Sequence, residues 1–281
     1  MGTTRSPLHR RDLLRLAGSA AVATVFHAPA LARNVPAVRT ITGTAFATTW
    51  GISLPETAHT SRLLAEVHTL LDTVDRQMSP YRTDSDITRV NRAAAGRCDL
   101  PAEMYEVTTV ALEIAEASVG AFDPTVGPLV SRWGFGPIQG DPRTGWRGLA
   151  LESGALLKDR ARLTLDLCGI AKGYALDGIV QLLDLAGLDG FLVDLGGEVF
   201  ARGSHPSGRP WHVGVEDPRP ESAELANVLA LANWAVATSG DRENGYVLGA
   251  RRYSHIIDPD TREPVADDIA SVSVIARDAI R

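Results

Sequence analysis

Apolar residues at helical spacing mark two segments in the first half of the chain. From Ser61 to Met78 they recur three and four residues apart, and Thr60 can cap the first turn. The stretch from Met104 to Val119 repeats this spacing and ends at Gly120, a residue typical of helix C-caps. We therefore predict an α-helix over each stretch.

Short alternating or apolar runs, typical of β-strands, dominate the second half. Near the N-terminus, Thr40 to Leu54 alternates threonine, apolar and small residues and predicts a strand or hairpin. Because helices come mainly first and strands late, the order predicts an α+β fold, not an alternating βα wheel. The later strands are expected at Phe191–Leu195, Glu198–Arg202, Trp211–Val215, Ala226–Leu231, Trp234–Thr238, Tyr253–Ile257 and Ser271–Ala276.

Two connecting segments carry polar or aromatic residues. Ser79 to Asn91 predicts a turn that leads into a short helix. Gly120 to Asp141 is rich in glycine and proline and contains Trp133 and Phe135, so we predict a loop that walls a ligand site.

The segment from Asp166 to Asp177 places two glycines around Lys172. The apolar run Leu163–Leu167 before it predicts a strand, and Tyr174–Leu185 predicts a helix. Backbone groups at such a turn suit phosphates and hard cations, and the lysine can place a compact charge on an anion. The spacing matches neither of the two main nucleotide-binding fingerprints. A tight turn with a solvent-facing lysine is therefore an equal alternative.

The first 32 residues have the features of a twin-arginine export signal. Arg10 and Arg11 precede a weakly apolar stretch, and Ala30-Leu31-Ala32 is a small-x-small cleavage site. The alternative, an uncleaved membrane anchor, is disfavoured because the stretch is too short to span a bilayer. We expect residues 1–32 to be removed, and the protein to work in the periplasm or on the outer face of the cytoplasmic membrane.

The remaining chain, 33–281, is expected to be globular, since 44% of all 281 residues are hydrophobic, and its length allows one large domain or two closely packed ones. Without the signal it carries 24 basic and 33 acidic residues, a formal charge of −9, which disfavours nucleic-acid binding. Cys98 and Cys168 are too few for a disulfide framework, so we predict two unpaired thiols.

Five segments, in this order and spacing, resemble the ApbE family of FAD:protein FMN transferases, and the resemblance spans nearly all of the chain after residue 32. They are Met78-Ser-Pro-Tyr81 with Ser85–Asn91, Phe122–Val130 with Trp133-Gly-Phe135, Asp166–Asp177, Asp194-Leu-Gly-Gly197, and Thr238-Ser-Gly240 with His255-Ile-Ile-Asp-Pro259. Each segment alone would be a weak signal.

The resemblance implies a defined chemistry and fold. Family members bind FAD, use Mg²⁺, split the pyrophosphate, and attach FMN through a phosphoester to a threonine of a target flavoprotein. The expected partner is a redox-pump subunit or an FMN-binding domain that carries the acceptor threonine. The implied fold has mixed or antiparallel sheets flanked by helices, with the FAD site in the central cleft.

His255 is the candidate general base, because an imidazole titrates near neutral pH and the transfer needs a group to accept the hydroxyl proton. The family motif implies the same role, and Asp258 could orient His255 or a nearby group. The alternative is a histidine that only hydrogen-bonds at a strand end.

The resemblance also implies FAD contacts. Asp123 could accept hydrogen bonds from the nucleotide, although an aspartate before proline is also a common turn residue. Tyr81 could stack on an aromatic ring system, although a buried amphipathic tyrosine would look the same. The full set of expected FAD contacts is Tyr81, Ala121, Phe122, Asp123, Lys172, Tyr174 and Ile257.

The backbone carbonyl of Ala171 is the implied Mg²⁺ ligand. The family's other metal ligands are an aspartate and a threonine in an Asp-Ala-x-x-Thr segment after the strand that matches Ser271–Ala276. Because this sequence stops at Arg281, about where that segment would begin, we expect either a domain truncated at its C-terminus or a member that has lost its metal site.

Two other functions stay open at this point. The same scaffold could hydrolyse FAD with water in place of threonine, or it could be an exported FAD-binding protein without turnover.

Overall fold

The computed structural model describes residues 37–58, 60–219, 222, 224–240, 244–249, 251–266 and 269–281, so the expected export signal lies outside the described residues. The largest sheet has six strands, and all its neighbouring pairs run antiparallel. In spatial order they are β1 (Val38–Ala45), β2 (Thr48–Pro55), β6 (Phe191–Leu195), β7 (Glu198–Arg202), β10 (Trp234–Gly240) and β13 (Ser271–Ala276).

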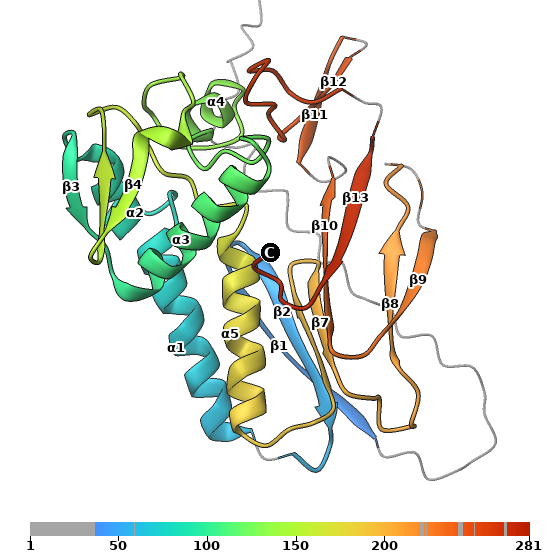
Figure 1. Cartoon of the computed structure of the whole chain (residues 1–281). Coiled ribbons are helices and arrows are strands. Elements are labelled where there is room, and N and C mark those ends of the chain that lie inside the picture. Colours follow the sequence, from blue (N-terminus) through green and yellow to red (C-terminus); the bar gives the residue numbers. More distant parts are fainter. Residues whose placement is uncertain are drawn as a thin grey trace, which may run out of the picture.

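Two long helices, α1 (Ser61–Met78) and α5 (Ala171–Leu185), lie side by side along this sheet (Figure 1). Their apolar positions are fully or almost fully buried, for example Val67 on α1 and Ile179 on α5. The helices approach closely at Gly178, where an added Cβ would lie 2.7 Å from a methyl group of Leu70. The main core therefore lies between this helix pair and the sheet.

A smaller unit packs against the C-terminal end of α1 (Figure 1). It contains α2 (Asp86–Arg92), α3 (Ala102–Ala117) and a three-stranded sheet of β3 (Gly96–Asp99), β5 (Ala155–Lys158) and β4 (Leu149–Glu152). A short 3-10 turn (Trp146–Gly148) directly precedes β4. The buried Lys158 amine donates to the carbonyls of Val90 and Ala93, at 2.9 and 3.0 Å, and so caps the C-terminal end of α2.

Two separate hairpins complete the described fold. One pairs β8 (Trp211–Glu216) with β9 (Leu225–Leu231), and the other pairs β11 (Gly245–Leu248) with β12 (Arg251–Ser254). The second hairpin stands at the same end of the molecule as α4 (Gly127–Arg132) (Figure 1). No helix in the described part of the chain is both long and apolar enough to cross a membrane.

The α+β prediction is confirmed, as are the expected helices at α1, α3 and α5 and the N-terminal hairpin. The hairpin turns at Phe46 and Ala47, whose φ angles of 51° and 58° fit a two-residue turn with both φ values positive. The two cysteines are free, as predicted: Cys98 is buried and Cys168 is exposed.

The predicted strand at Leu163–Leu167 is wrong. This buried stretch has no neighbouring strand, because a side chain satisfies its backbone instead: Asn91 donates to the Leu165 carbonyl at 2.8 Å and accepts from the Leu165 nitrogen at 2.7 Å. The Asp166 nitrogen donates to the Pro124 carbonyl at 2.7 Å. The run is apolar because it is buried, and hydrophobic periodicity alone does not distinguish a buried strand from a buried irregular segment.

Several other elements differ from prediction. The segment Gly120–Asp141 is not all loop but contains α4, which begins with a glycine and a proline in its first turn. The strand expected at Tyr253–Ile257 is β12 and ends at Ser254, and Ile257 forms an isolated bridge with Pro264. The strands β3, β4, β5 and β11 were not predicted, because each has only four residues.

Candidate active site

A pocket of about 110 Å³ collects side chains from four segments that are far apart in the sequence. Tyr81 follows α1, Phe135 follows α4, Asp166 and Cys168 precede α5, and His255 follows β12. The pocket thus joins Tyr81 and His255, predicted separately from two motifs, to the glycine turn. We treat it as the centre of the candidate site.

Tyr81 lies at the mouth of this pocket with 69% of its surface exposed. Its hydroxyl donates to the Phe135 carbonyl at 3.3 Å. Partial burial of the phenol, together with the nearby Cys168 and Asp166, raises the pKa of Tyr81. The structural alternative, a tyrosine buried in the core, does not fit this exposure, so the ring is available to stack on a ligand.

Asp166 contributes a carboxylate to the pocket wall. Its carboxylate accepts from the Cys168 nitrogen at 2.9 Å, and a Cβ added to Gly127 would lie 3.1 Å from its other oxygen. Burial raises the pKa of Asp166. Cys168 is exposed as a residue, but its thiol lines the pocket and is desolvated there, and this desolvation and the adjacent Asp166 carboxylate raise the pKa of the thiol, so this cysteine is not a thiolate at neutral pH.

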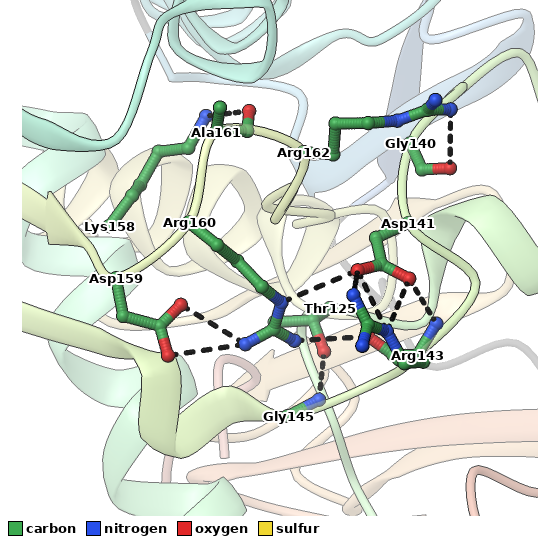
Figure 2. Close-up of polar contacts among 10 residues, drawn as sticks. All are labelled: Thr125, Gly140, Asp141, Arg143, Gly145, Lys158, Asp159, Arg160, Ala161 and Arg162. Atoms are coloured by element: carbon green, nitrogen blue, oxygen red, sulfur yellow. Dashed lines mark hydrogen bonds and ion pairs between the residues drawn. The ribbon is translucent and has the colours of Figure 1, made fainter.

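Asp123 is buried in the turn before α4, behind the pocket. One carboxylate oxygen accepts from both the nitrogen and the hydroxyl of Thr125, at 2.8 and 2.6 Å. The same hydroxyl accepts from the Gly145 nitrogen at 2.8 Å, which ties the turn to the loop after α4 (Figure 2). These contacts support the turn role of Asp123.

The loop that carries Gly145 is in turn held by ion pairs. Figure 2 shows the guanidinium of Arg160 between two carboxylates, with Asp159 at 3.0 Å and Asp141 at 3.6 Å. Arg160 also donates to the Arg143 carbonyl at 3.1 Å. The Arg143 guanidinium on the Asp141 carboxylate lowers the pKa of Asp141 to about 2. This network therefore stabilises the loop behind Thr125.

The other two residues of the Ala-Phe-Asp motif differ in exposure. Ala121 is exposed, and its nitrogen donates to the Ser118 carbonyl at 3.1 Å. Phe122 packs against the main core and lies beside the glycine turn, where an added Cβ on Gly169 would be 3.4 Å from its ring. Phe122 thus connects this motif to the turn before α5.

Lys172 faces the Asp-Leu-Gly-Gly turn, not open solvent. Its amine pairs with Glu198 at 3.1 Å. Burial raises the pKa of Glu198 and of Asp194, and in both cases the positive charge of Lys172 opposes the effect. The Gly197 nitrogen donates to Asp194 at 2.9 Å, and Gly197 needs its glycine because φ is 90°. Lys172 is thus held by an ion pair, although 36% of its side chain remains exposed to solvent.

Tyr174 reaches away from this turn toward α3, where its hydroxyl donates to Glu106 at 3.3 Å. Burial, together with the negative Glu106 and Glu103, raises the pKa of Tyr174 to about 12. The structure thus places Tyr174 at the junction of α3 and α5.

The described residues do not offer a complete Mg²⁺ site. Ala171, whose carbonyl is the implied ligand, is the first residue of α5. Across the described ranges, no three His, Cys, Asp or Glu side chains form a group that could hold a metal ion. The acidic groups nearby are engaged: Glu198 binds Lys172, Asp194 binds Gly197, and Asp177 binds backbone nitrogens. We derive no step through the metal from these residues.

His255 follows β12 and enters the pocket with its ring 6.2 Å from that of Phe135, at 66°. The carboxylate of Asp258 accepts from the nitrogens of Asp260 and Thr261, at 2.8 and 3.2 Å, and the first of these bonds lowers the pKa of Asp258. Asp258 therefore shapes the turn after the histidine motif. Ile257, an expected FAD contact, is buried beside it.

The ApbE family model matches residues 46–281. The chain belongs to the ApbE family. It is 33% identical over 258 residues to the FAD:protein FMN transferase of Vibrio cholerae serotype O1, covering 84% of this chain and 75% of the relative. The enzyme of the same name from Escherichia coli K12 is 32% identical over 263 residues, covering 86% of this chain and 75% of that protein.

Solved structures of this family have the same fold. The flavin transferase ApbE from Vibrio cholerae matches with a TM-score of 0.77 and 31% identity, over 87% of this chain and 84% of that one. The apo form of the Pseudomonas stutzeri flavinyl transferase ApbE also matches with a TM-score of 0.77, at 33% identity, over 87% of this chain and 81% of that one.

In this family member the predicted site residues form two neighbouring groups. Tyr81 and His255 meet in the pocket, while Ala171, Lys172 and Tyr174 follow the glycine turn onto α5. Sequence reasoning missed the pocket positions of Asp166 and Cys168. The only signal for Asp166 was its position at the start of the glycine motif, because its bond to Pro124 joins segments that no local pattern connects.

Proposed function

We propose that this protein transfers FMN from FAD to a threonine hydroxyl of a target flavoprotein and releases AMP. It belongs to the ApbE family, and its relatives named FAD:protein FMN transferase support a transferase that acts on FAD. The observation that carries the proposal is the convergence of His255 and Tyr81 on one pocket beside the glycine turn.

In this reaction the threonine oxygen attacks the phosphorus that belongs to the FMN half of FAD. The new oxygen–phosphorus bond forms as the bond to the AMP phosphate breaks, and AMP leaves. An imidazole nitrogen of His255 accepts the threonine proton. The exposed ring of Tyr81 stacks on the flavin, and Lys172 near the N-terminus of α5 provides positive charge for the phosphates.

The proposal includes dependence on magnesium, because the family resemblance implies it. When bound, Mg²⁺ would neutralise phosphate charge, and the Ala171 carbonyl is the ligand that the resemblance implies. Titration of the transfer rate with MgCl₂ after EDTA treatment tests this part by itself.

The decisive experiment incubates the protein with FAD, MgCl₂ and an FMN-binding domain, and measures covalent flavin on the domain by in-gel fluorescence and mass. A Thr→Ala version of the acceptor domain is the control for the attachment site. Attachment to the threonine acceptor and not to its alanine version, with one AMP released per label, supports the proposal. AMP and FMN release that needs no acceptor indicates a hydrolase, and bound but uncleaved FAD indicates a binding protein.

His255→Ala tests the proposed base. We expect loss of transfer by about 10²-fold or more with FAD affinity retained, because a general base acts on the chemical step. His212→Ala, on the exposed face of β8, is the matched control and should transfer at the parent rate. Equal transfer rates in His255→Ala and the parent would remove His255 from the mechanism.

We propose that the protein is exported through the twin-arginine pathway, because Arg10 and Arg11 form the paired arginines of such a signal. Replacing both by lysine should leave the precursor in the cytoplasmic fraction. Continued appearance of the processed protein in the periplasmic fraction would contradict this assignment.

A further inference from the structure

Four aromatic rings form a continuous stack between the loop after α4 and the hairpin β11–β12. Trp133 stacks on Tyr253 with ring centres 5.7 Å apart, Tyr253 on Tyr246 at 5.2 Å, and Tyr246 on Phe135 at 5.2 Å. The interplanar angles lie between 20° and 26°. We call Trp133, Tyr253, Tyr246 and Phe135 the aromatic stack.

Both ends of the stack reach the His255 segment. At one end, Phe135 meets the His255 ring edge-to-face at 6.2 Å. At the other end, the Trp133 indole nitrogen donates to the Arg262 carbonyl at 3.0 Å, in the turn that follows the histidine motif. The ends of the stack therefore contact the candidate base itself and the turn that follows it.

The hairpin β11–β12 pairs with no other strand in the part of the chain that the structure describes. Its two strands form a sheet of their own, with Tyr246 directly opposite Tyr253 across the pair. A two-stranded hairpin alone is only marginally stable in water, whereas stacked aromatic pairs stabilise a contact beyond the effect of their buried area. His255 is the first residue after β12, so the docking of this hairpin decides where the imidazole lies.

Burial alone does not explain the central ring. Tyr246 is 37% exposed, and Val247 and Leu248 beside it are 64% and 69% exposed. Tyr246 is thus not a core residue, and its described ring contacts are those to Phe135 and Tyr253.

We infer that the aromatic stack is the positioning element of His255 and that Tyr246 is the residue that connects the hairpin to the pocket wall. This inference rests on the proposed function for the role of His255, but the placement of the ring can be measured without any reaction. Tyr246 acts through Phe135 and is a positioning residue, not a catalytic one.

The test compares Tyr246→Ala, Tyr246→Phe and Val247→Ala in the full chain. For Tyr246→Ala we expect kcat for FMN transfer to fall about tenfold or more, because a small misplacement of a catalytic group can cost roughly 10²-fold. The Kd for FAD should stay within about twofold, since the ring lies outside the proposed FAD contacts. Tyr246→Phe keeps the ring and should restore kcat, and Val247→Ala, on the same strand but outside the stack, should keep it.

A reaction-free readout separates this inference from the proposed function. The ring-proton NMR signals of His255, identified by their loss in His255→Ala, should shift in Tyr246→Ala and not in Val247→Ala. Unchanged His255 signals in Tyr246→Ala would overturn the inference even if the parent transfers FMN. So would an equal loss of kcat in Val247→Ala or in Tyr246→Phe. If the parent shows no transfer at all, the proposed function fails while the shift in signals still supports the positioning role.

Discussion

The backbone nitrogen of Ala279 donates to both carboxylate oxygens of Asp177, at 2.8 and 3.0 Å. The nitrogen of Ile280 adds a third bond at 2.9 Å. This places the segment after β13 directly on α5, where Gly173 leaves no room for a side chain against the Ala279 carbonyl (Figure 1). The Asp177 carboxylate on α5 thus holds the segment after β13 beside the glycine turn.

Asp177 should make stability depend on pH. Burial, opposed by these backbone bonds and assisted by the negative Asp278 and Glu198, raises the pKa of Asp177 to about 6. Between the unfolded value near 4 and about 6, the folded protein binds a proton that the unfolded chain does not. Its contribution to stability is therefore full below about pH 4 and is lost as pH rises through 6, by about 1–2 kcal/mol after allowing for solvent screening.

The measurement is urea unfolding at several pH values from about 3 to about 7, roughly one unit either side of the expected change. Asp177→Asn should flatten the pH dependence relative to the parent, because the amide does not titrate. Asp72→Asn, at an exposed carboxylate on α1, should leave it unchanged. Parallel curves for Asp177→Asn and the parent would contradict the assignment.

Thr125→Val should destabilise the protein more than a comparable change in a helix. Thr125 is 1% exposed, and its hydroxyl both donates to Asp123 and accepts from Gly145. Valine leaves the half-buried Gly145 nitrogen without this acceptor and the buried Asp123 carboxylate without this donor, which costs about 1–3 kcal/mol. The control is Thr108→Val, where a buried hydroxyl donates only to a helical carbonyl, that of Met104.

The loss in unfolding free energy should thus be larger for Thr125→Val by about 1 kcal/mol or more. We also expect weaker FAD binding, because Thr125 fixes the turn that holds Asp123. Equal losses for the two threonine variants would show that the turn does not depend on this hydroxyl.

Lys158→Met should destabilise the unit that contains α2. Its amine is buried among backbone carbonyls of Val90 and Ala93, and burial lowers the pKa of Lys158. Methionine matches the size of the lysine stem but cannot donate, so the carbonyls of Val90 and Ala93 both lose this donor, at a cost of about 1–3 kcal/mol. The midpoint temperature of thermal unfolding should fall by roughly 2–4 °C for each kcal/mol of lost stability in a chain of this size.

Leu157→Met, one residue earlier on β5, is the control for the lysine variant and should shift the midpoint less, because it conserves volume. A Lys158→Met variant as stable as Leu157→Met would mean that the carbonyls of α2 find other partners.

Much of the fold could be predicted from local pattern. The periodic apolar positions of Leu63, Val67 and Val74 are buried as expected, because a helix face is decided by spacing along the chain. The strand expected at Leu163–Leu167 failed because burial, not pairing, makes this run apolar, and its hydrogen-bond partner is Asn91, some seventy residues earlier. The local sequence gives no sign that a side chain, and not a neighbouring strand, satisfies the backbone of this run.

The sequence by itself determined the order of helices and strands, the glycine turn before α5, and the motifs that indicate the ApbE family. Only the tertiary structure decided which of these meet: Tyr81 with His255 in one pocket, Lys172 with Glu198, and Tyr246 with Phe135. The physical reason is that periodicity and turn chemistry act between near neighbours, whereas these contacts close long loops whose cost is repaid by burial of the whole core.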